Sequence, residues 1–283
     1  MKRREFIQTS ALTAAGLLTL PSLTRPAKIQ GQLGLQLYTL RDTILKDPKG
    51  VLRKVAGYGY KELESFSYSE GKIFGMAFRE FGSFAKDLGM KVVSGHYGLD
   101  QTEGNSWERA ISDANAIGQE YMVVPYLVDS DRKSIDGYKK ICEKLNKAGE
   151  ACSKQGIRFG YHNHAFEFDL LEGQKPFDVL LAELDPKYVG MEMDIYWVVR
   201  AGGDPLQYFD RYPGRFEQWH VKDMDKKDHD RNADVGTGSI DYKQIFAQAK
   251  KAGMKHWYVE QESYPANPMN SVDASARYLK KLL

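Results

Sequence analysis

Short apolar runs alternate with longer amphipathic segments along most of the chain, and this alternation predicts an α/β fold. The apolar runs are rich in Val, Leu, Met, Tyr and Trp, and most are continuously apolar, as expected of buried parallel strands. They cover residues 33–38, 60–64, 91–96, 121–126, 158–162, 188–194, 218–222 and 257–260.

The segments between these runs carry apolar residues at helical spacing, so we expect helices there. One is predicted over 71–88, another over 136–155 and a last one over 273–283. The first of them carries Phe74, Phe78, Phe81 and Phe84 on one face. We expect this row of rings to pack against the sheet and not to bind a cofactor.

Strand followed by helix, repeated eight times in about 250 residues, predicts a single (β/α)8 TIM barrel. The alternative is a doubly wound open sheet, which would need a glycine-rich phosphate loop after an early strand. The only glycine clusters, 202–205 and 236–238, do not have that spacing. We therefore predict one barrel domain over 31–283.

The first thirty residues are predicted to lie outside the barrel. Arg3 and Arg4 precede Phe6 and a short apolar stretch over 11–20, a pattern that resembles a twin-arginine export signal. That stretch is too short for a permanent membrane span, and no run of about eighteen apolar residues follows. We therefore expect 1–30 to be a signal segment that directs export, to the periplasm for example, without stable membrane insertion.

The charge balance argues against a polyanionic partner. Lys and Arg number 40 against 38 Asp and Glu, which gives a formal net charge of +2. Proteins that bind nucleic acid are usually more basic along the binding face. We expect no nucleic acid partner.

Four candidate metal ligands stand at the ends of four successive predicted strands: His162, Asp194, His220 and Glu260. In a closed barrel all carboxyl ends of the strands meet at one face, so these residues converge. Two imidazoles and two carboxylates suit Mn, Zn, Co or Fe better than Ca or Mg. We predict one divalent metal ion. For Asp194 taken alone, the alternative is an N-cap of the next helix.

Other residues at the same mouth of the barrel are candidates for substrate contacts. Lys222 lies two residues beyond His220 and should share its face, where a lysine is costly unless it is paired or used. Tyr126 is a candidate for an apolar wall. The substrate-binding candidates are His96, Glu64, Trp197, Tyr38 and Arg231. For Glu64 the alternative is support of a metal-binding histidine. For the others, ordinary packing or a solvated charge remains the alternative.

Several motifs at the predicted strand ends occur together in one known family. They are Gly34-Leu35-Gln36-Leu37-Tyr38, Ser94-Gly95-His96, Tyr161-His162-Asn163-His164, Met193-Asp194, Trp219-His220-Val221-Lys222-Asp223 and Val259-Glu260. With them the chain resembles the xylose-isomerase-like barrel family, which holds sugar isomerases, ketose epimerases, inosose dehydratases and endonuclease IV. The resemblance covers the chain after residue 30.

The resemblance implies a metal site with one departure. Asp194, His220 and Glu260 match three ligands of the ketose epimerase branch, but His162 stands where those enzymes usually have Glu. There, two glutamates move the proton on either side of a metal-bound enediolate, and imidazole cannot act as a base through its ligating nitrogen. Glu260 is then the leading base. Its partner is expected from Glu167, His164, His96 or Lys222.

The resemblance therefore implies a metal-dependent sugar isomerase or epimerase that acts on a sugar or keto-sugar. A lyase or hydrolase acting on a 3-keto-glycoside at the same metal site is the alternative, because an enediolate beside a leaving group eliminates. A non-catalytic sugar-binding barrel is a further alternative. Endonuclease chemistry fits poorly, because six histidines leave little room for a three-zinc site. The expected partner is a small-molecule sugar, and assembly into a homo-oligomer remains open.

Overall fold

The computed structural model describes residues 31–282, and its centre is a barrel of eight parallel strands. Each strand coincides with one of the predicted apolar runs to within a few residues. The strands are β1 (Gly34–Gln36), β2 (Glu62–Ser65), β5 (Lys91–Gly95), β6 (Tyr121–Val124), β7 (Arg158–His162), β8 (Val189–Asp194), β9 (Gln218–Val221) and β12 (His256–Val259). The predicted TIM barrel is confirmed.

Closure of the barrel occurs between β5 and β6. The spatial order of the strands is β5-β2-β1-β12-β9-β8-β7-β6, so these two stand at its ends. His96 pairs with Val123 in a parallel bridge. The amide of Tyr97 donates a hydrogen bond to the carbonyl of Val123 at 2.9 Å. The amide of Glu120 donates one to the carbonyl of Val93 at 2.8 Å.

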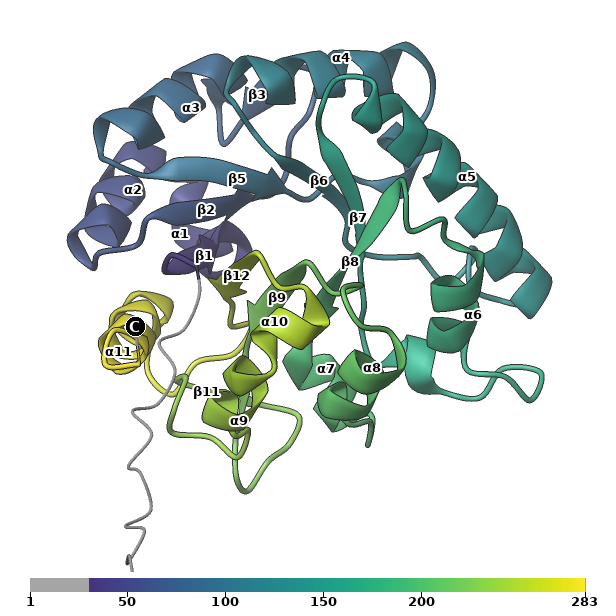
Figure 1. Ribbon diagram of the computed structural model, residues 1–283. Coiled ribbons are helices and arrows are strands. Elements are labelled where there is room, and N and C mark those ends of the chain that lie inside the picture. Colours follow the sequence, from purple (N-terminus) through teal and green to yellow (C-terminus); the bar gives the residue numbers. More distant parts are fainter. Residues whose placement is uncertain (1–30, 283) are drawn as a thin grey trace, which may run out of the picture.

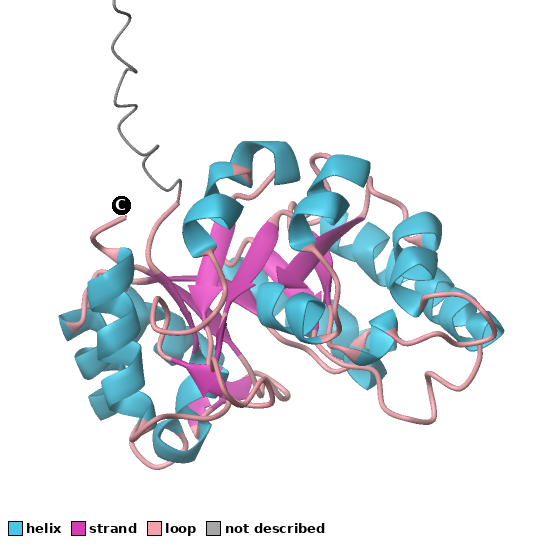
Figure 2. Ribbon diagram, turned by 90° about the horizontal axis from the view of Figure 1, so that it is seen from below, coloured by secondary structure: helices cyan, strands magenta, loops and turns pink. Residues whose placement is uncertain are grey.

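Helices surround the strands, as Figure 1 shows, and the view from below in Figure 2 places the strands between them. Within 31–282 no helix combines the length and the apolar character that a membrane span requires. The helices are α1 (Arg41–Ile44), α2 (Pro48–Gly57), α3 (Phe78–Asp87), α4 (Gly104–Ala116), α5 (Ile135–Ser153), α6 (Pro176–Glu183), α7 (Ile195–Arg200), α8 (Pro205–Arg211), α9 (Tyr242–Ala247), α10 (Ala249–Ala252) and α11 (Pro268–Leu279). The signal segment predicted over 1–30 lies outside the described residues.

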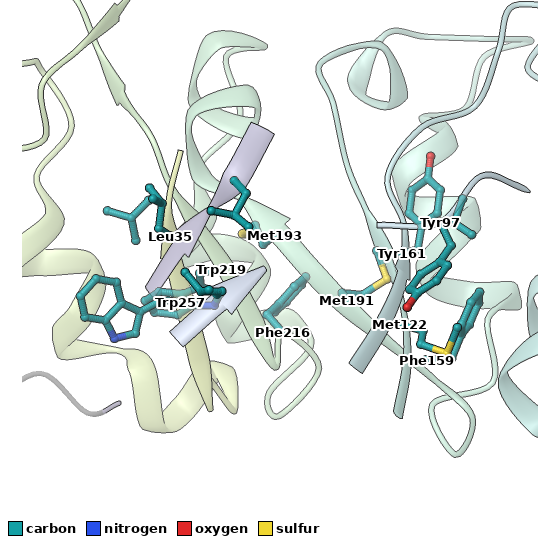
Figure 3. Packing of buried hydrophobic residues seen from close by; sticks show 14 of the residues in the cluster. Leu35, Tyr97, Met122, Phe159, Tyr161, Met191, Met193, Phe216, Trp219 and Trp257 are labelled. Atoms are coloured by element: carbon teal, nitrogen blue, oxygen red, sulfur yellow. The ribbon is translucent and has the colours of Figure 1, made fainter. Parts of the chain in front are cut away.

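The alternation of side chains along each strand separates the apolar core from the polar interior of the barrel. On β8, Met191 and Met193 belong to the apolar cluster shown in Figure 3. Successive side chains of a strand point to opposite faces, so Glu192 and Asp194 point into the barrel. On β9, Trp219 belongs to the same cluster. The same rule therefore directs polar side chains from several strands toward one central point.

The helix predicted over 71–88 is wrong in its first part. A small antiparallel hairpin, β3 (Lys72–Ile73) with β4 (Met76–Ala77), precedes α3. Gly75 lies at the hairpin turn with a φ of 76°, and the neighbouring Phe74 also has a positive φ, of 50°. Phe74 is nevertheless buried, as expected, and the centroid of its ring lies 5.6 Å from the ring centroid of Phe81. A second hairpin joins β10 (Asp223–Met224) and β11 (Asn232–Ala233).

Candidate metal centre

The four predicted metal ligands come together at the carboxyl end of the barrel. His162 and Asp194 are the last residues of β7 and β8, His220 is in β9, and Glu260 directly follows β12. All four are buried. Strand pairing places Asp194 opposite His220. Residues far apart in the sequence thus share one small volume, as the barrel topology predicted.

Groups that can hold a metal ion form two overlapping sets among the described residues. We call Asp194, His220 and Glu260 the carboxylate-rich set. In it, Nδ1 of His220 lies 2.9 Å from Oε2 of Glu260 and 3.9 Å from Oδ2 of Asp194. In each of the two sets the candidate ligand atoms lie within 4.8 Å of one another.

The second set, which we call the histidine-rich set, consists of His96, His162, Glu192 and His220. Its centre is Oε1 of Glu192. Nε2 of His96 lies 2.9 Å from this oxygen, Nδ1 of His162 lies 3.1 Å away, and Nε2 of His220 lies 3.2 Å away. The three imidazole rings have centroid separations of 4.5 to 5.5 Å. Two of these residues were predicted as metal ligands, and His96 was predicted as a substrate contact.

Glu64, in β2, contacts two of these three histidines. Its Oε2 lies 2.5 Å from Nε2 of His220 and 3.2 Å from Nε2 of His96. The side chains of Gln36 and Ser94 donate hydrogen bonds to Glu64 at 2.8 and 2.6 Å. Glu64 was predicted to contact substrate or to support a histidine, and its contacts are those of the second role.

Lys222 lies inside the barrel with its charge fully paired. Its Nζ lies 2.9 Å from Oδ2 of Asp194, 2.7 Å from Oε2 of Glu260 and 2.6 Å from Oε1 of Glu262. The side chain is completely buried. A buried ammonium group is stable only with such partners. Lys222 therefore supplies a positive charge to the carboxylate-rich set.

The electrostatics of the cluster divide its members into charged and neutral groups. Burial acts to lower the pKa of His96, but the nearby carboxylates of Glu64 and Glu192 outweigh this effect and raise the pKa to about 9. The carboxylates around His220 likewise raise its pKa well above the ordinary value, against the effect of burial. Burial, followed by the charge of His220, lowers the pKa of His162 well below its usual range. Without a metal ion, His96 and His220 are protonated and His162 is neutral.

The carboxylates differ in the same way. Burial raises the pKa of Asp194 to about 6, although Lys222 and His220 oppose this. Burial also acts to raise the pKa of Glu260, but the charges of Lys222 and His220 outweigh this effect and lower the pKa below its usual value. Burial also raises the pKa of Glu192, and the nearby charge of Glu64 adds to the effect. Glu260 is thus ionised at neutral pH.

A cavity of about 550 Å³ opens onto this cluster. Its walls are largely aromatic, which suits the apolar faces of a sugar ring. Tyr38 and Tyr126 are 39% and 43% exposed. The lining consists of Tyr38, Phe66, Ser67, His96, Tyr97, Gly98, Pro125, Tyr126, His162, His164, Glu260 and Glu262. Its basic groups are imidazoles, and its carboxylates are Glu260 and Glu262.

The two predicted acid/base residues in the loop after β7 have different surroundings. His164 lines the cavity, its ring is 5.5 Å from that of Trp197, and its Nδ1 has no hydrogen-bond partner among the described residues. Burial lowers the pKa of His164 to about 3, so the ring is neutral. Glu167 is buried, and it accepts hydrogen bonds from the hydroxyl of Tyr161 at 2.7 Å and from the amide of His164 at 2.9 Å. Glu167 is absent from the cavity lining, and its contacts position the His164 loop.

The remaining substrate-binding candidates divide between the cavity and the surface. Tyr38 and His96 line the cavity. Trp197 does not belong to the lining, and the ammonium of Lys222 lies 5.2 Å from its ring centre. Arg231 is exposed and does not belong to the lining. The structure therefore does not bring Arg231 to the site, and its predicted substrate contact has no support.

Three site residues were missed as such in the sequence. Glu192 has the same orientation as Asp194 because the two are separated by one residue on β8. That alternation, in Met-Glu-Met-Asp, is a signal that finds it. Gln36 in β1 and Glu262 after β12 join the cluster through Glu64 and Lys222.

The donor set fits a divalent ion. Imidazole nitrogens with a minority of carboxylate oxygens are the ligands that Zn, Mn, Fe and Co accept in proteins. Oε2 of Glu192 is buried and has no hydrogen-bond partner in the described part of the chain. A buried carboxylate oxygen without a donor is costly, and a bound cation would satisfy it. His162, His220 and their neighbouring carboxylates can therefore hold one metal ion.

Comparison with known proteins shows that the chain is similar to one family of barrels. The family model described as xylose isomerase-like TIM barrel matches residues 52–282. Inosose dehydratase from Lactiplantibacillus plantarum is 26% identical over 178 residues, which are 56% of this chain and 57% of that protein. The match thus spans little more than half of that relative's length.

Two further similarities cover more of the chain. Inosose dehydratase from Geobacillus kaustophilus is 24% identical over 272 residues, 84% of this chain and 80% of that protein. The crystal structure of a sugar phosphate isomerase/epimerase from Parabacteroides distasonis superposes with a TM-score of 0.78 at 28% identity, and covers 90% of this chain and 95% of that one.

Proposed function

The chain belongs to the xylose isomerase-like TIM barrel family, as its strand-end motifs predicted, and we propose that it is a divalent-metal-dependent enzyme that moves a proton beside the carbonyl group of a sugar or keto-sugar. One observation carries the proposal. Three imidazoles and several buried carboxylates converge at the end of an aromatic-walled cavity of about 550 Å³. Such a convergence of titratable groups in a cleft is typical of active sites.

A bound divalent ion would polarise adjacent carbonyl and hydroxyl oxygens and so acidify the C–H bond between them. The protein's own groups have to remove that proton and place it elsewhere. Glu260 borders the cavity and is ionised at neutral pH because of Lys222 and His220. We assign Glu260 the role of base.

Lys222 and His164 have complementary roles in this proposal. The ammonium of Lys222 touches Glu260 and Glu262, so it can stabilise negative charge that develops on a substrate oxygen, or protonate that oxygen. His164 is neutral and presents an unpaired Nδ1 in a wall of the cavity, so it can hold a substrate hydroxyl. Glu167 acts through the His164 loop and does not touch substrate.

Removal of the proton beside the carbonyl group gives an enediolate, and the next step of this intermediate decides which reaction occurs. Return of the proton to the other face or to the neighbouring carbon gives epimerisation or isomerisation. A second candidate is elimination, in which a hydroxyl group on the next carbon leaves with a proton as water and a C=C double bond forms. The relatives named inosose dehydratase favour elimination. A glycoside would lose its sugar or alcohol in the same step.

Solvent exchange tests the proposal without knowledge of the final product. The metal-loaded protein is incubated with keto-sugars in D2O, and NMR follows deuterium incorporation next to the carbonyl. We expect exchange in the wild type and at least a hundredfold loss in Glu260→Gln, with Glu167→Gln retaining it. Full exchange by Glu260→Gln would remove Glu260 as the base. Loss of water from the product, detected by mass, separates elimination from isomerisation.

The proposal includes export of the protein by the twin-arginine route. The supporting feature is the Arg3-Arg4 pair before the apolar stretch over 11–20. Replacing both arginines with lysine should leave the protein in the cytoplasm. Fractionation of cells that express the two full-length forms tests this, and equal export of both would contradict it.

A further inference from the structure

We propose that the cavity contains a second binding region, which holds an uncharged ring attached to the sugar on which the metal centre acts. This inference rests on the proposed function, because it names the class of substrate that the same site takes. The substrate is then a keto-glycoside, and the attached ring is a second sugar or an aromatic group. We call this region the distal subsite, and it consists of Tyr38, Phe66, Ser67, Tyr97, Pro125 and Tyr126.

The cavity extends from the metal centre toward one side of the barrel. The distal subsite comes from the segments that follow β1, β2, β5 and β6. These four strands are neighbours in the closed barrel, because β5 stands beside both β2 and β6 (Figure 1). No described residue that follows β8 or β9 belongs to the lining. The room beyond the metal centre therefore lies on the side of the distal subsite.

The size of the cavity exceeds the need of a single sugar ring. Its volume of about 550 Å³ lies within the range of about 300–1,000 Å³ that is typical of pockets for drug-sized ligands. His162 and Glu260 are buried parts of its lining, whereas Tyr38 and Tyr126 are exposed. A single ring at the metal centre leaves these two exposed rings uncovered, so we infer that a longer ligand covers them.

The distal subsite has two aromatic sides. On one side, the rings of Tyr38 and Phe66 are in edge contact, with their centroids 5.2 Å apart. On the other side, the ring centroid of Tyr126 lies 5.2 Å from that of His164 and 5.5 Å from that of Phe166. The first side follows β1 and β2, and the second follows β6 and β7, with β5 between them. Aromatic side chains of this kind suit the C–H face of a sugar ring or the face of an aromatic ring.

The distal subsite suits a neutral group better than an anion. None of its six residues is Asp, Glu, Lys, Arg or His. Phosphate groups are commonly held by Arg or Lys side chains, and the distal subsite contains neither. The carboxylates of Glu260 and Glu262 border the same cavity and repel an anion. We therefore expect an uncharged ring there and not a phosphate group.

Two arginines near the distal subsite are engaged with its aromatic sides. The guanidinium carbon of Arg41 lies 4.7 Å from the ring centre of Tyr38, and its Nη2 donates a hydrogen bond to a backbone carbonyl in the loop after β12 at 2.9 Å. The guanidinium carbon of Arg132 lies 3.8 Å from the ring centre of Phe166, and Arg132 forms an ion pair with Asp129. Both cations thus hold protein groups in place, which leaves the binding surface itself neutral.

Hydrogen bonds fix the distal subsite relative to the metal centre. The amide of Tyr38 donates a hydrogen bond to Oε1 of Gln36 at 2.9 Å, and Nε2 of the same Gln36 side chain donates one to Glu64 at 2.8 Å. Glu64 in turn contacts His220 and His96. The rigid connection lets a ring bound beside Tyr38 determine where the reacting carbons lie at the metal centre.

Deuterium exchange with a series of compounds tests the inference. The metal-loaded protein is incubated in D2O with methyl 3-keto-glucoside, phenyl 3-keto-glucoside, a 3-keto-disaccharide and 3-keto-glucose 1-phosphate, and NMR follows incorporation next to the carbonyl. Because contacts with aromatic rings strengthen binding, we expect kcat/KM to be about tenfold or more higher with a ring-bearing glycoside than with the methyl glycoside. The phosphate should give the lowest value. The better of the two ring-bearing compounds identifies the ring as a sugar or as an aromatic group.

Two results would overturn the inference and leave the proposed function standing. One is equal kcat/KM for the methyl glycoside and both ring-bearing glycosides. The other is a higher value for the phosphate than for the methyl glycoside. Exchange with none of the four compounds would contradict the proposed function as well.

Variants of the two exposed tyrosines locate the effect. Tyr38→Ala and Tyr126→Ala should each reduce the ratio of kcat/KM between the better ring-bearing compound and the methyl glycoside by about threefold or more. A general loss of structure lowers both values alike and leaves this ratio unchanged. Leu170→Ala, at an exposed position outside the lining, is the control and should keep the wild-type ratio. An unchanged ratio in both tyrosine variants would contradict the assignment.

Discussion

The ammonium nitrogen of Lys222 lies 2.7 Å from Oε2 of Glu260, at a place in the barrel where both side chains are almost completely out of contact with water. The same oxygen lies 2.9 Å from Nδ1 of His220. Glu260 therefore stands between a fixed cation and a histidine that a metal ion would bind. This relationship accounts for an ionised carboxylate at the edge of the cavity, and it links the stability of the site to its chemistry.

Removal of the Lys222 charge should destabilise the metal-free protein. Lys222→Met keeps most of the volume but leaves Asp194 and Glu260 buried without their partner, and breaking a buried pair costs about 3–5 kcal/mol. Urea denaturation measures the free energy of unfolding. Lys227→Met, at an exposed position, is the control and should change it by less than about 0.5 kcal/mol. Equal stability of the two variants would show that Lys222 is not needed to balance these carboxylates.

Stability of the metal-free protein should fall as the pH rises above neutrality. The pKa of His96 is raised to about 9 by Glu64 and Glu192, against burial, from an ordinary value of 6.5. A group whose pKa is higher in the folded state than in the unfolded state stabilises the fold. This stabilisation is complete below the unfolded-state pKa and is lost as the pH rises through the folded-state pKa. We expect a loss on the order of 3 kcal/mol between about pH 6.5 and 9.

The variant His96→Asn tests the source of that pH dependence. It removes the titrating group, so the slope of unfolding free energy against pH should become shallower over the same window. Thermal or urea denaturation at several pH values provides the measurement, with chelator present to exclude metal. An unchanged slope would place the pH dependence elsewhere.

Asp194 should have two separable contributions. Its side chain accepts a hydrogen bond from the amide of Trp197 at 3.1 Å, which caps α7, and it also contacts Lys222. Asp194→Asn keeps an oxygen that can cap and loses the charge, whereas Asp194→Ala loses both. The alanine variant should be less stable than the asparagine variant by about 1 kcal/mol, the usual value of an N-cap. Equal unfolding free energies would mean that the cap contributes nothing.

Tyr126 should contribute to substrate affinity more than to turnover. Its ring lies at the cavity wall, 5.2 Å from His164 and 5.5 Å from Phe166, and is 43% exposed. Loss of an aromatic surface worth about 0.5–1.5 kcal/mol corresponds to a rise in KM of about twofold to twelvefold. Tyr126→Ala should show this with kcat within about twofold. Leu170→Ala, at a 72% exposed position away from the lining, is the control.

The barrel could be predicted from the sequence because each strand is a buried apolar run and the carboxyl ends of the strands must meet. The convergence of His162, Asp194, His220 and Glu260 at one end of the barrel was predicted by that rule alone. The same rule is easily misapplied to polar residues that alternate with core residues inside a strand. Glu192 was overlooked between Met191 and Met193, although it points to the same side as Asp194.

Other features depend on contacts that no local pattern contains. The hairpin before α3 interrupts a run of phenylalanines at helical spacing, and only Gly71 and Gly75, both with positive φ, indicate the turns. The pairing of Lys222 with Glu262 joins two segments 40 residues apart. The exposed position of Arg231 follows from the course of the loop after β10, which the sequence does not specify.

Metal analysis of the purified protein tests the central claim most directly. Elemental analysis by mass spectrometry measures the metal content of wild-type protein and of His220→Ala after incubation with Mn²⁺, Co²⁺ or Zn²⁺ and removal of free ions. His220 contributes to both candidate ligand sets, so its loss should abolish binding wherever the ion lies. We predict one divalent ion per chain in the wild type and less than a tenth of that in the variant. No retained metal in the wild type, or equal retention in both, would contradict the account.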